Sequence, residues 1–212
     1  AGRTGDLDRF PRLFWYHRPL ARRTVQEDLL PAWAEAVLRG DTGDARARLA
    51  AARSIAEEWE AQTSDASLLS AVAEIERAAG FTREQLARGY QALGAAARAH
   101  ATFDYAAVDA EAERALAALP KDSLATKWAL VLRLDCAIYV AGAVEPLAHT
   151  LLDDPATDMA TRGRALWLVA LWRAKRGEFP DALPDYLNAI ELYAQLDERD
   201  PVVWLRDFVG EA

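Results

Sequence analysis

The sequence predicts an all-α fold: an array of about ten helices, arranged as antiparallel helical hairpins stacked into an α-solenoid. Apolar residues recur at helical spacing through most of the 212 residues, and no segment shows the alternation typical of a strand. Signals for helix starts and helix breaks follow one another at intervals of one helix. Between Gly163 and Ala194, small and aromatic residues have the spacing of a helix–turn–helix unit, which must bury one face against a neighbour.

Residues 1–23 predict a basic, aromatic N-terminal arm. They contain six Arg and two Asp, a net charge of +4, whereas residues 178–212 contain nine acids and two Arg, a net charge of −7. Prolines interrupt any helix in the arm. Its aromatic side chains, among them Phe14 and Trp15, either pack on the first helices or contact another domain or subunit.

Residues 24–80 predict a region of helical hairpins. The first helix (24–39) begins with capping-box spacing between Thr24 and Glu27 and bends at Pro31. A second helix (44–62) follows a glycine-rich break, and its apolar stripe consists of Leu49, Ala52, Ile55, Ala56 and Trp59. Asp65 can cap a third helix, which a glycine ends at residue 80.

Residues 81–212 predict repeated hairpins closed by a terminal helix. A capping box over 82–85 starts a helix that runs to Thr102, and a second helix covers 104–119. The helix over 123–141 is apolar almost all round, which predicts that neighbours cover it on both sides and bury Cys136 as an inert thiol. A shorter helix ends near Leu152. The hairpin over 163–194 follows, and the terminal helix carries Val202, Val203, Leu205 and Phe208.

The hairpin over 163–194 resembles the tetratricopeptide (TPR) repeat. The residues that carry the resemblance are Leu166, Val169, Ala170, Gly177, Phe179, Ala182, Tyr186 and Ala189. A degenerate copy lies upstream, with Leu93, Gly94, Phe103, Ala106 and Ala110 at the pattern positions. The chain departs from the pattern at Arg173, where an aromatic residue is favoured, and at Ala101, which replaces the turn glycine. The resemblance covers about residues 82–194.

The TPR resemblance implies a concave face that binds a protein or peptide. It places Arg164, Trp167, Leu171 and Lys175 on that face, and the upstream register adds Arg88, Gln91 and Arg98. Basic groups in a groove can accept an acidic peptide or a terminal carboxylate, although the same charges can equally belong to a solvated face. A weaker resemblance, over residues 29–41 and 68–76, is to the helical region of bacterial TPR–CHAT proteins, which carry a caspase-like peptidase. It implies a regulatory segment whose catalytic domain lies outside this chain.

One cluster of aspartates and one single carboxylate are candidates for chemistry. Asp153, Asp154 and Asp158 resemble the Asp-rich Mg²⁺ motif of all-α terpenoid synthases, but Pro155 interrupts the helix and no second metal motif is visible, which favours a solvated turn. Asp135 lies on the very apolar helix. A buried carboxylate needs a partner, so we expect a salt bridge from an Arg of an adjacent helix, with a polar spot in a binding groove as the alternative.

Composition narrows the classes of function. Hydrophobic residues make up 52% of the chain, including seven Trp, six Tyr and six Phe, which supplies a core and excludes a disordered acidic tail. The formal net charge is −8, which does not suit duplex nucleic acid. The longest apolar run, around 138–144, is too short for a membrane span, and no charged leader precedes an apolar core. We therefore expect no nucleic acid, no membrane and a cytoplasmic location.

These observations together predict a non-catalytic protein- or peptide-binding or regulatory helical repeat module, part of a larger bacterial protein. We expect no cofactor and no catalytic metal. The partner is a protein or peptide of acidic character, and the arm offers a route to self-association. The alternatives are a ligand-sensing domain and a small all-α metal-dependent enzyme that uses the Asp153/Asp154/Asp158 cluster.

Overall fold

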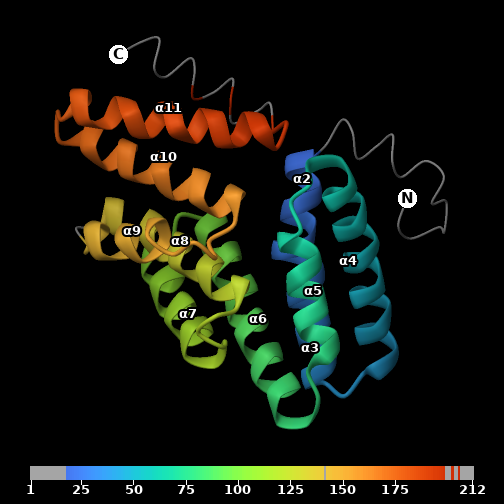
Figure 1. Cartoon of the computed structure of the whole chain (residues 1–212). Helices are drawn as coiled ribbons and strands as arrows, with labels where there is room; N and C mark the ends of the chain where they lie inside the picture. Colours follow the sequence, from blue (N-terminus) through green and yellow to red (C-terminus); the bar gives the residue numbers. More distant parts are fainter. Residues whose placement is uncertain (1–17, 141, 199–201, 203–204, 206–212) are drawn as a thin grey trace.

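The structure, a computed structural model, describes residues 18–140, 142–198, 202 and 205, and these are all-helical, without a strand. Figure 1 shows two groups of helices: α2 to α5 stand side by side, and α7 to α9 lie on the other side of α6 beneath α10 and α11. The expected fold class, all-α, is confirmed for this part of the chain. The finer prediction of a repeat solenoid stays a prediction.

The first rod begins earlier than expected and contains a wide turn. It consists of α2 (Arg18–Arg23), the π-helical segment η2 (Thr24–Leu29) and α3 (Leu30–Leu38). Thr24 makes no capping bond, so the predicted capping box is wrong, and the rod extends into the predicted arm. Instead, the backbone N–H of Leu30 donates to the carbonyl of Val25, five residues back. The next residue is Pro31, whose ring would clash with a carbonyl in a regular helix, and the wider turn accommodates it.

The next two helices are α4 (Thr42–Thr63) and α5 (Ser67–Arg77). Gly40 turns the chain with φ +76°, and Asp41 caps α4 by accepting the N–H of Asp44 at 2.9 Å. Asp65 accepts the N–H of Ser67 at 2.9 Å, as expected of a capping residue. The interior of this group contains the fully buried side chains of Trp33, Trp59, Leu68 and Ile75.

Three antiparallel hairpins follow. They are α6 (Gly80–Ala101) with α7 (Tyr105–Ala118), α8 (Leu124–Tyr139) with α9 (Val144–Leu152), and α10 (Met159–Lys175) with α11 (Phe179–Gln195). Each helix packs on the next in sequence, and α8 also contacts both α6 and α10. α6 packs against α3, which joins the hairpins to the first group. The predicted capping box over 82–85 is wrong, because α6 already begins at Gly80.

The first hairpin differs from the predicted repeat register by two residues. Ala106 and Ala110, which the TPR pattern places against α6, are exposed. The side chains that α7 buries are Val108, Ala112 and Ala115. Gly94 does not face α7, because a Cβ on it would lie 2.5 Å from the Cβ of Pro31 in α3. The small residue that resembled a hairpin contact therefore accommodates a different helix.

The last hairpin follows the predicted pattern. Ala182 and Ala189 of α11 are buried, and Gly177 makes the turn with φ +81°. A Cβ on Gly163 would meet the Tyr193 ring at 3.5 Å, so the two helices approach closely there. Phe179, by contrast, is exposed. Of the predicted terminal helix, the structure describes Val202 and Leu205, which are helical and buried against this hairpin.

Candidate functional site

The clearest concave feature is a groove above α6, bounded by α3 on one side and α7 on the other. Its volume is about 740 Å³. Arg88, Gln91 and Arg98, three residues predicted to bind a partner, all line it. The other lining residues are Glu35 of α3, Phe81, Glu84, Gln85, Ala92 and Ala95 of α6, and Glu111, Arg114, Ala117 and Ala118 of α7.

The lining of this groove combines small apolar side chains with charged side chains of both signs. The alanines of α6 and α7 keep the groove open, and Phe81, 75% exposed, offers a large apolar surface at the start of α6. Arg98 lies 3.9 Å from Glu35, and Arg114 lies 2.5 Å from Glu111. Arg88 forms no ion pair within the described part of the chain. A groove of this kind can hold a peptide backbone over the alanines and a carboxylate at the free guanidinium.

The second predicted set lies elsewhere. Arg164, Trp167, Leu171 and Lys175 follow one face of α10, whereas Arg88, Gln91 and Arg98 face the groove between α3 and α7. Counting 100° per residue around α6 places Arg98 about 160° away from His100, which points towards α8 and α10. The prediction that both sets share one concave face is therefore wrong. The first set lies on the side of α6 between α3 and α7, away from the side on which His100 contacts Asp135 of α8.

Arg164 and Lys175 of α10 already contact other side chains of this protein. Arg164 donates to Asp135 of α8 at 2.6 Å and lies 4.1 Å over the Trp167 ring. The ammonium of Lys175 lies 4.0 Å over the Tyr139 ring, which stacks on Tyr105 at 4.8 Å. Sequence reasoning missed both tyrosines, because each lies at a helix end whose neighbours only the packing determines.

Asp135 is the buried carboxylate at the junction of three helices. The predicted salt bridge to an Arg of an adjacent helix is present, and His100 of α6 adds a second contact at 3.1 Å. Burial pushes the pKa of Asp135 upwards, but the hydrogen bonds and charges of His100 and Arg164 outweigh burial, and the pKa lies below its ordinary value. The site ties α6, α8 and α10 together.

The three aspartates of the candidate metal cluster have separate partners. Asp154 pairs with Lys127 of α8, and Asp153 lies 3.3 Å from His149 on the exposed side of α9. Asp158 caps α10, accepting from the N–H of Thr161 at 2.9 Å and from its hydroxyl at 2.6 Å. In the described ranges, no group of three or more His, Cys, Asp or Glu is arranged to hold a metal ion.

Cys136 is buried, as the sequence predicts. Its thiol donates to the carbonyl of Tyr105 at 3.3 Å. Burial, with the charge of Asp109 as a smaller contribution, raises the pKa of this thiol to about 11. It is therefore protonated at neutral pH, which does not suit a nucleophile.

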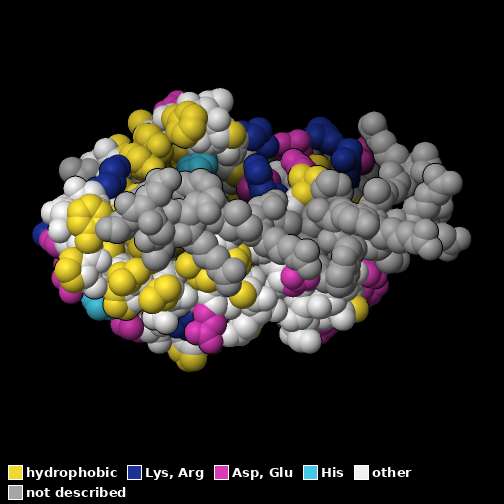
Figure 2. All heavy atoms as spheres, turned by 90° about the horizontal axis from the view of Figure 1, so that it is seen from above, with side chains coloured by type: hydrophobic (Ala, Val, Ile, Leu, Met, Phe, Trp, Pro, Cys, Tyr) yellow, Lys and Arg dark blue, Asp and Glu magenta, His cyan; other side chains and the backbone are white. Residues whose placement is uncertain are grey.

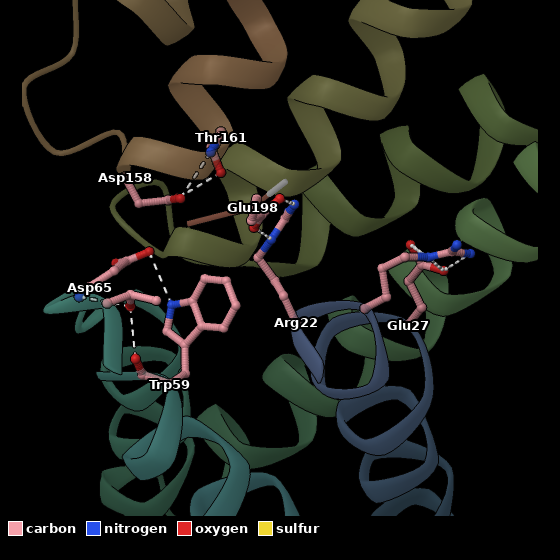
Figure 3. Close-up of polar contacts among 9 residues, drawn as sticks. Arg22, Glu27, Trp59, Asp65, Asp158, Thr161 and Glu198 are labelled. Atoms are coloured by element: carbon pink, nitrogen blue, oxygen red, sulfur yellow. Dashed lines mark hydrogen bonds and ion pairs between the residues drawn. The ribbon is translucent and has the colours of Figure 1, made fainter. Parts of the chain in front are cut away.

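A buried ion pair joins the first rod to the end of the last hairpin (Figure 3). Arg22 donates to Glu198 through Nε at 2.9 Å and Nη2 at 3.1 Å, and the carboxylate is fully buried. Burial alone lowers the pKa of a guanidinium, but Glu198 more than compensates and raises the pKa of Arg22. Arg22 belongs to the basic segment 1–23 and Glu198 to the acidic segment 178–212, so these two segments of opposite charge meet at this pair.

No family model, curated protein or solved structure matches this chain significantly. The resemblances to TPR and TPR–CHAT proteins therefore remain expectations. None of the helices in the described part of the chain has both the length and the apolar run that crossing a bilayer requires. Phe14 and Trp15, the candidate contact residues of the arm, lie outside the described residues.

Proposed function

We propose that this protein is a non-catalytic helical repeat module that binds a segment of another protein in the groove between α3, α6 and α7. The observation that supports the proposal is that three residues chosen from the sequence, Arg88, Gln91 and Arg98, line one groove with an alanine floor. The bound segment is a short peptide with at least one acidic side chain. Arg88 donates hydrogen bonds to that carboxylate.

The same contacts argue against the enzyme alternative. Catalysis by the Asp cluster needs carboxylates that converge on one point, and Asp153, Asp154 and Asp158 instead contact three different partners. One observation, the Arg22–Glu198 ion pair, favours the ligand-sensing alternative. A contact between distant parts of the chain can form or break when a helical array closes around a ligand. Neither residue of that pair lines the groove between α3, α6 and α7.

A displayed library of random peptides tests the proposal. The full chain serves as bait, and the variant Arg88→Glu serves as counter-selection bait. We expect enrichment of acidic peptides that bind the parent and lose at least about tenfold in affinity for Arg88→Glu, which corresponds to one charge-assisted contact. Arg83→Glu, on the same helix but outside the groove lining, is the matched control and should bind as the parent does.

Two outcomes would overturn the assignment. Peptides that bind the parent and both variants equally would show that the groove is not the site. A saturable Mg²⁺ isotherm by titration calorimetry, lost in Asp154→Asn, would revive the metal-dependent enzyme instead.

A further inference from the structure

The floor of the groove between α3, α6 and α7 is one continuous face of α6. The α6 residues that line the groove recur every three or four positions, so they lie on the same side of the helix. They are Phe81, Glu84, Gln85, Arg88, Gln91, Ala92, Ala95 and Arg98. At about 1.5 Å per residue, this face is about 25 Å long, which is about five helical turns.

The groove differs in charge from the apolar end of the molecule. Seen from above α11, hydrophobic side chains gather at the end where α9, α10 and α11 lie (Figure 2). The groove lining instead contains three Glu and three Arg. Four of these side chains pair with one another, Arg98 with Glu35 at 3.9 Å and Arg114 with Glu111 at 2.5 Å. The other two charges of the lining are available to a partner.

These two charges are Glu84 and Arg88 of α6. Both side chains are exposed, and neither forms an ion pair with any residue of the described part of the chain. They are four positions apart, which is about 6 Å along the helix axis. A partner that neutralises both must present a basic and an acidic side chain with the same separation. Two residues four positions apart on a helix meet this requirement.

The middle of the groove offers little to the backbone of an extended peptide. From Gln85 to Ala95 the floor is the interior of α6, where backbone N–H and C=O groups bond within the helix. The amide side chains in the lining are those of Gln85 and Gln91. An extended segment would lose water at its own N–H and C=O groups and find few partners, whereas a helix bonds its own backbone. The small side chains of Ala92 and Ala95 let a second helix approach closely.

We propose that the occupant of the groove is an amphipathic helix of the partner protein, about five turns long, which lies along α6. It carries a basic side chain facing Glu84 and an acidic side chain facing Arg88, four positions apart. Apolar side chains on the same face contact the alanines, and one at the end packs on Phe81, which is 75% exposed. This inference rests on the proposed function, and it names the kind of segment that the groove binds.

A display library of helical peptides tests the proposal. Each peptide has about 18 residues of Ala and Gln, with one face randomised among Leu, Ala, Glu and Lys. Selection on the full chain should enrich peptides with Leu on that face and with one Lys and one Glu four positions apart in a fixed order. The double variant Glu84→Arg/Arg88→Glu should enrich the opposite order. Each selected peptide should bind its own bait at least about tenfold more tightly than the other bait.

The matched control is Arg23→Glu/Glu27→Arg, which exchanges an exposed pair, also four positions apart, outside the groove lining. This variant should enrich the same order of Lys and Glu as the parent. Proline substitutions test whether the bound peptide is helical. Pro in the middle of a selected peptide, on the side away from the groove, should weaken binding at least about tenfold, whereas Pro at its first helical position should not.

Other outcomes would overturn one proposal or both. Peptides that depend on Arg88 but tolerate the central Pro would overturn the helical occupant and leave the groove as the binding site. The same holds if the parent and the charge-reversed variant enrich the same order, or if only non-helical peptides bind in an Arg88-dependent manner. Helical peptides that bind the parent and Arg88→Glu equally would overturn the groove itself as the site, and the helical occupant with it.

Discussion

Arg22 and Glu198, 176 positions apart in the sequence, form a bidentate ion pair whose carboxylate is fully buried. The pair closes the helical array at the point where α2 and the end of α11 meet. A single charge left in such a place is costly, because neither water nor a counter-charge replaces the lost partner.

The first prediction concerns this pair. Glu198→Ala should lower the free energy of unfolding by about 3–5 kcal/mol, because the Arg22 guanidinium then stays mostly buried without a counter-charge. The double variant Arg22→Met/Glu198→Leu should recover part of the loss. Urea unfolding measures both values. The Arg23–Glu27 pair is exposed, so Glu27→Ala is the control and should change stability by about 0–1 kcal/mol. Equal losses in Glu198→Ala and Glu27→Ala would contradict the burial of the pair.

The second prediction concerns pH and Asp135. Its folded-state pKa is lower than the unfolded value of about 3.9, so its contribution to stability is complete above that pH and is lost as the pH falls through the folded-state pKa. Asp135→Asn should cost about 1.5–3 kcal/mol at pH 7. The difference in free energy of unfolding between Asp135→Asn and the parent should become smaller below about pH 4, as measured by denaturant titrations. The exposed Asp153→Asn is the control. A difference that stays constant down to pH 2 would show that Asp135 is not stabilised as a carboxylate.

The third prediction compares two alanines that the TPR pattern treats as equivalent. Ala182 is buried between α10 and α11, whereas Ala106 on α7 is exposed. Ala182→Leu should overpack the hairpin and cost about 1–3 kcal/mol. Ala106→Leu should change stability by less than about 0.5 kcal/mol. Denaturant midpoints of the two variants distinguish the registers, and a large loss in Ala106→Leu would favour the pattern's register for the first hairpin.

The fourth prediction concerns the contact between α6 and α3. Alanine at position 94 would place its Cβ 2.5 Å from the Cβ of Pro31, so Gly94→Ala should cost about 1–3 kcal/mol despite its better helix propensity. Gly43 lies in α4, where a Cβ would meet its nearest atom at 3.6 Å. Gly43→Ala should therefore stabilise the protein by about 0.4–1 kcal/mol. Thermal unfolding measures both. Stabilisation by both substitutions would show that the two helices do not approach this closely.

The sequence by itself determined the helical elements and most of their ends. Apolar periodicity and turn residues act over one or two helical turns, so both ends of α4 and α7, and the end of α9, could be predicted within two residues. The small residues of the last hairpin could also be predicted, because Ala182 and Ala189 pack against the neighbouring helix in the chain. Local signals failed at Thr24 and at 82–85, where a capping box is present in the sequence but the helix already starts upstream.

Only the tertiary structure decided which faces meet. A glycine on a helix permits a close approach without specifying the partner, and Gly94 accommodates Pro31 of α3 where the pattern expected α7. Arg88 lies in the groove between α3 and α7, whereas Arg164 pairs with the buried Asp135 where α6, α8 and α10 meet. The Arg22–Glu198 pair has no local signal at all. Its two members come together because every intervening helix packs as it does, and that is a property of the whole fold.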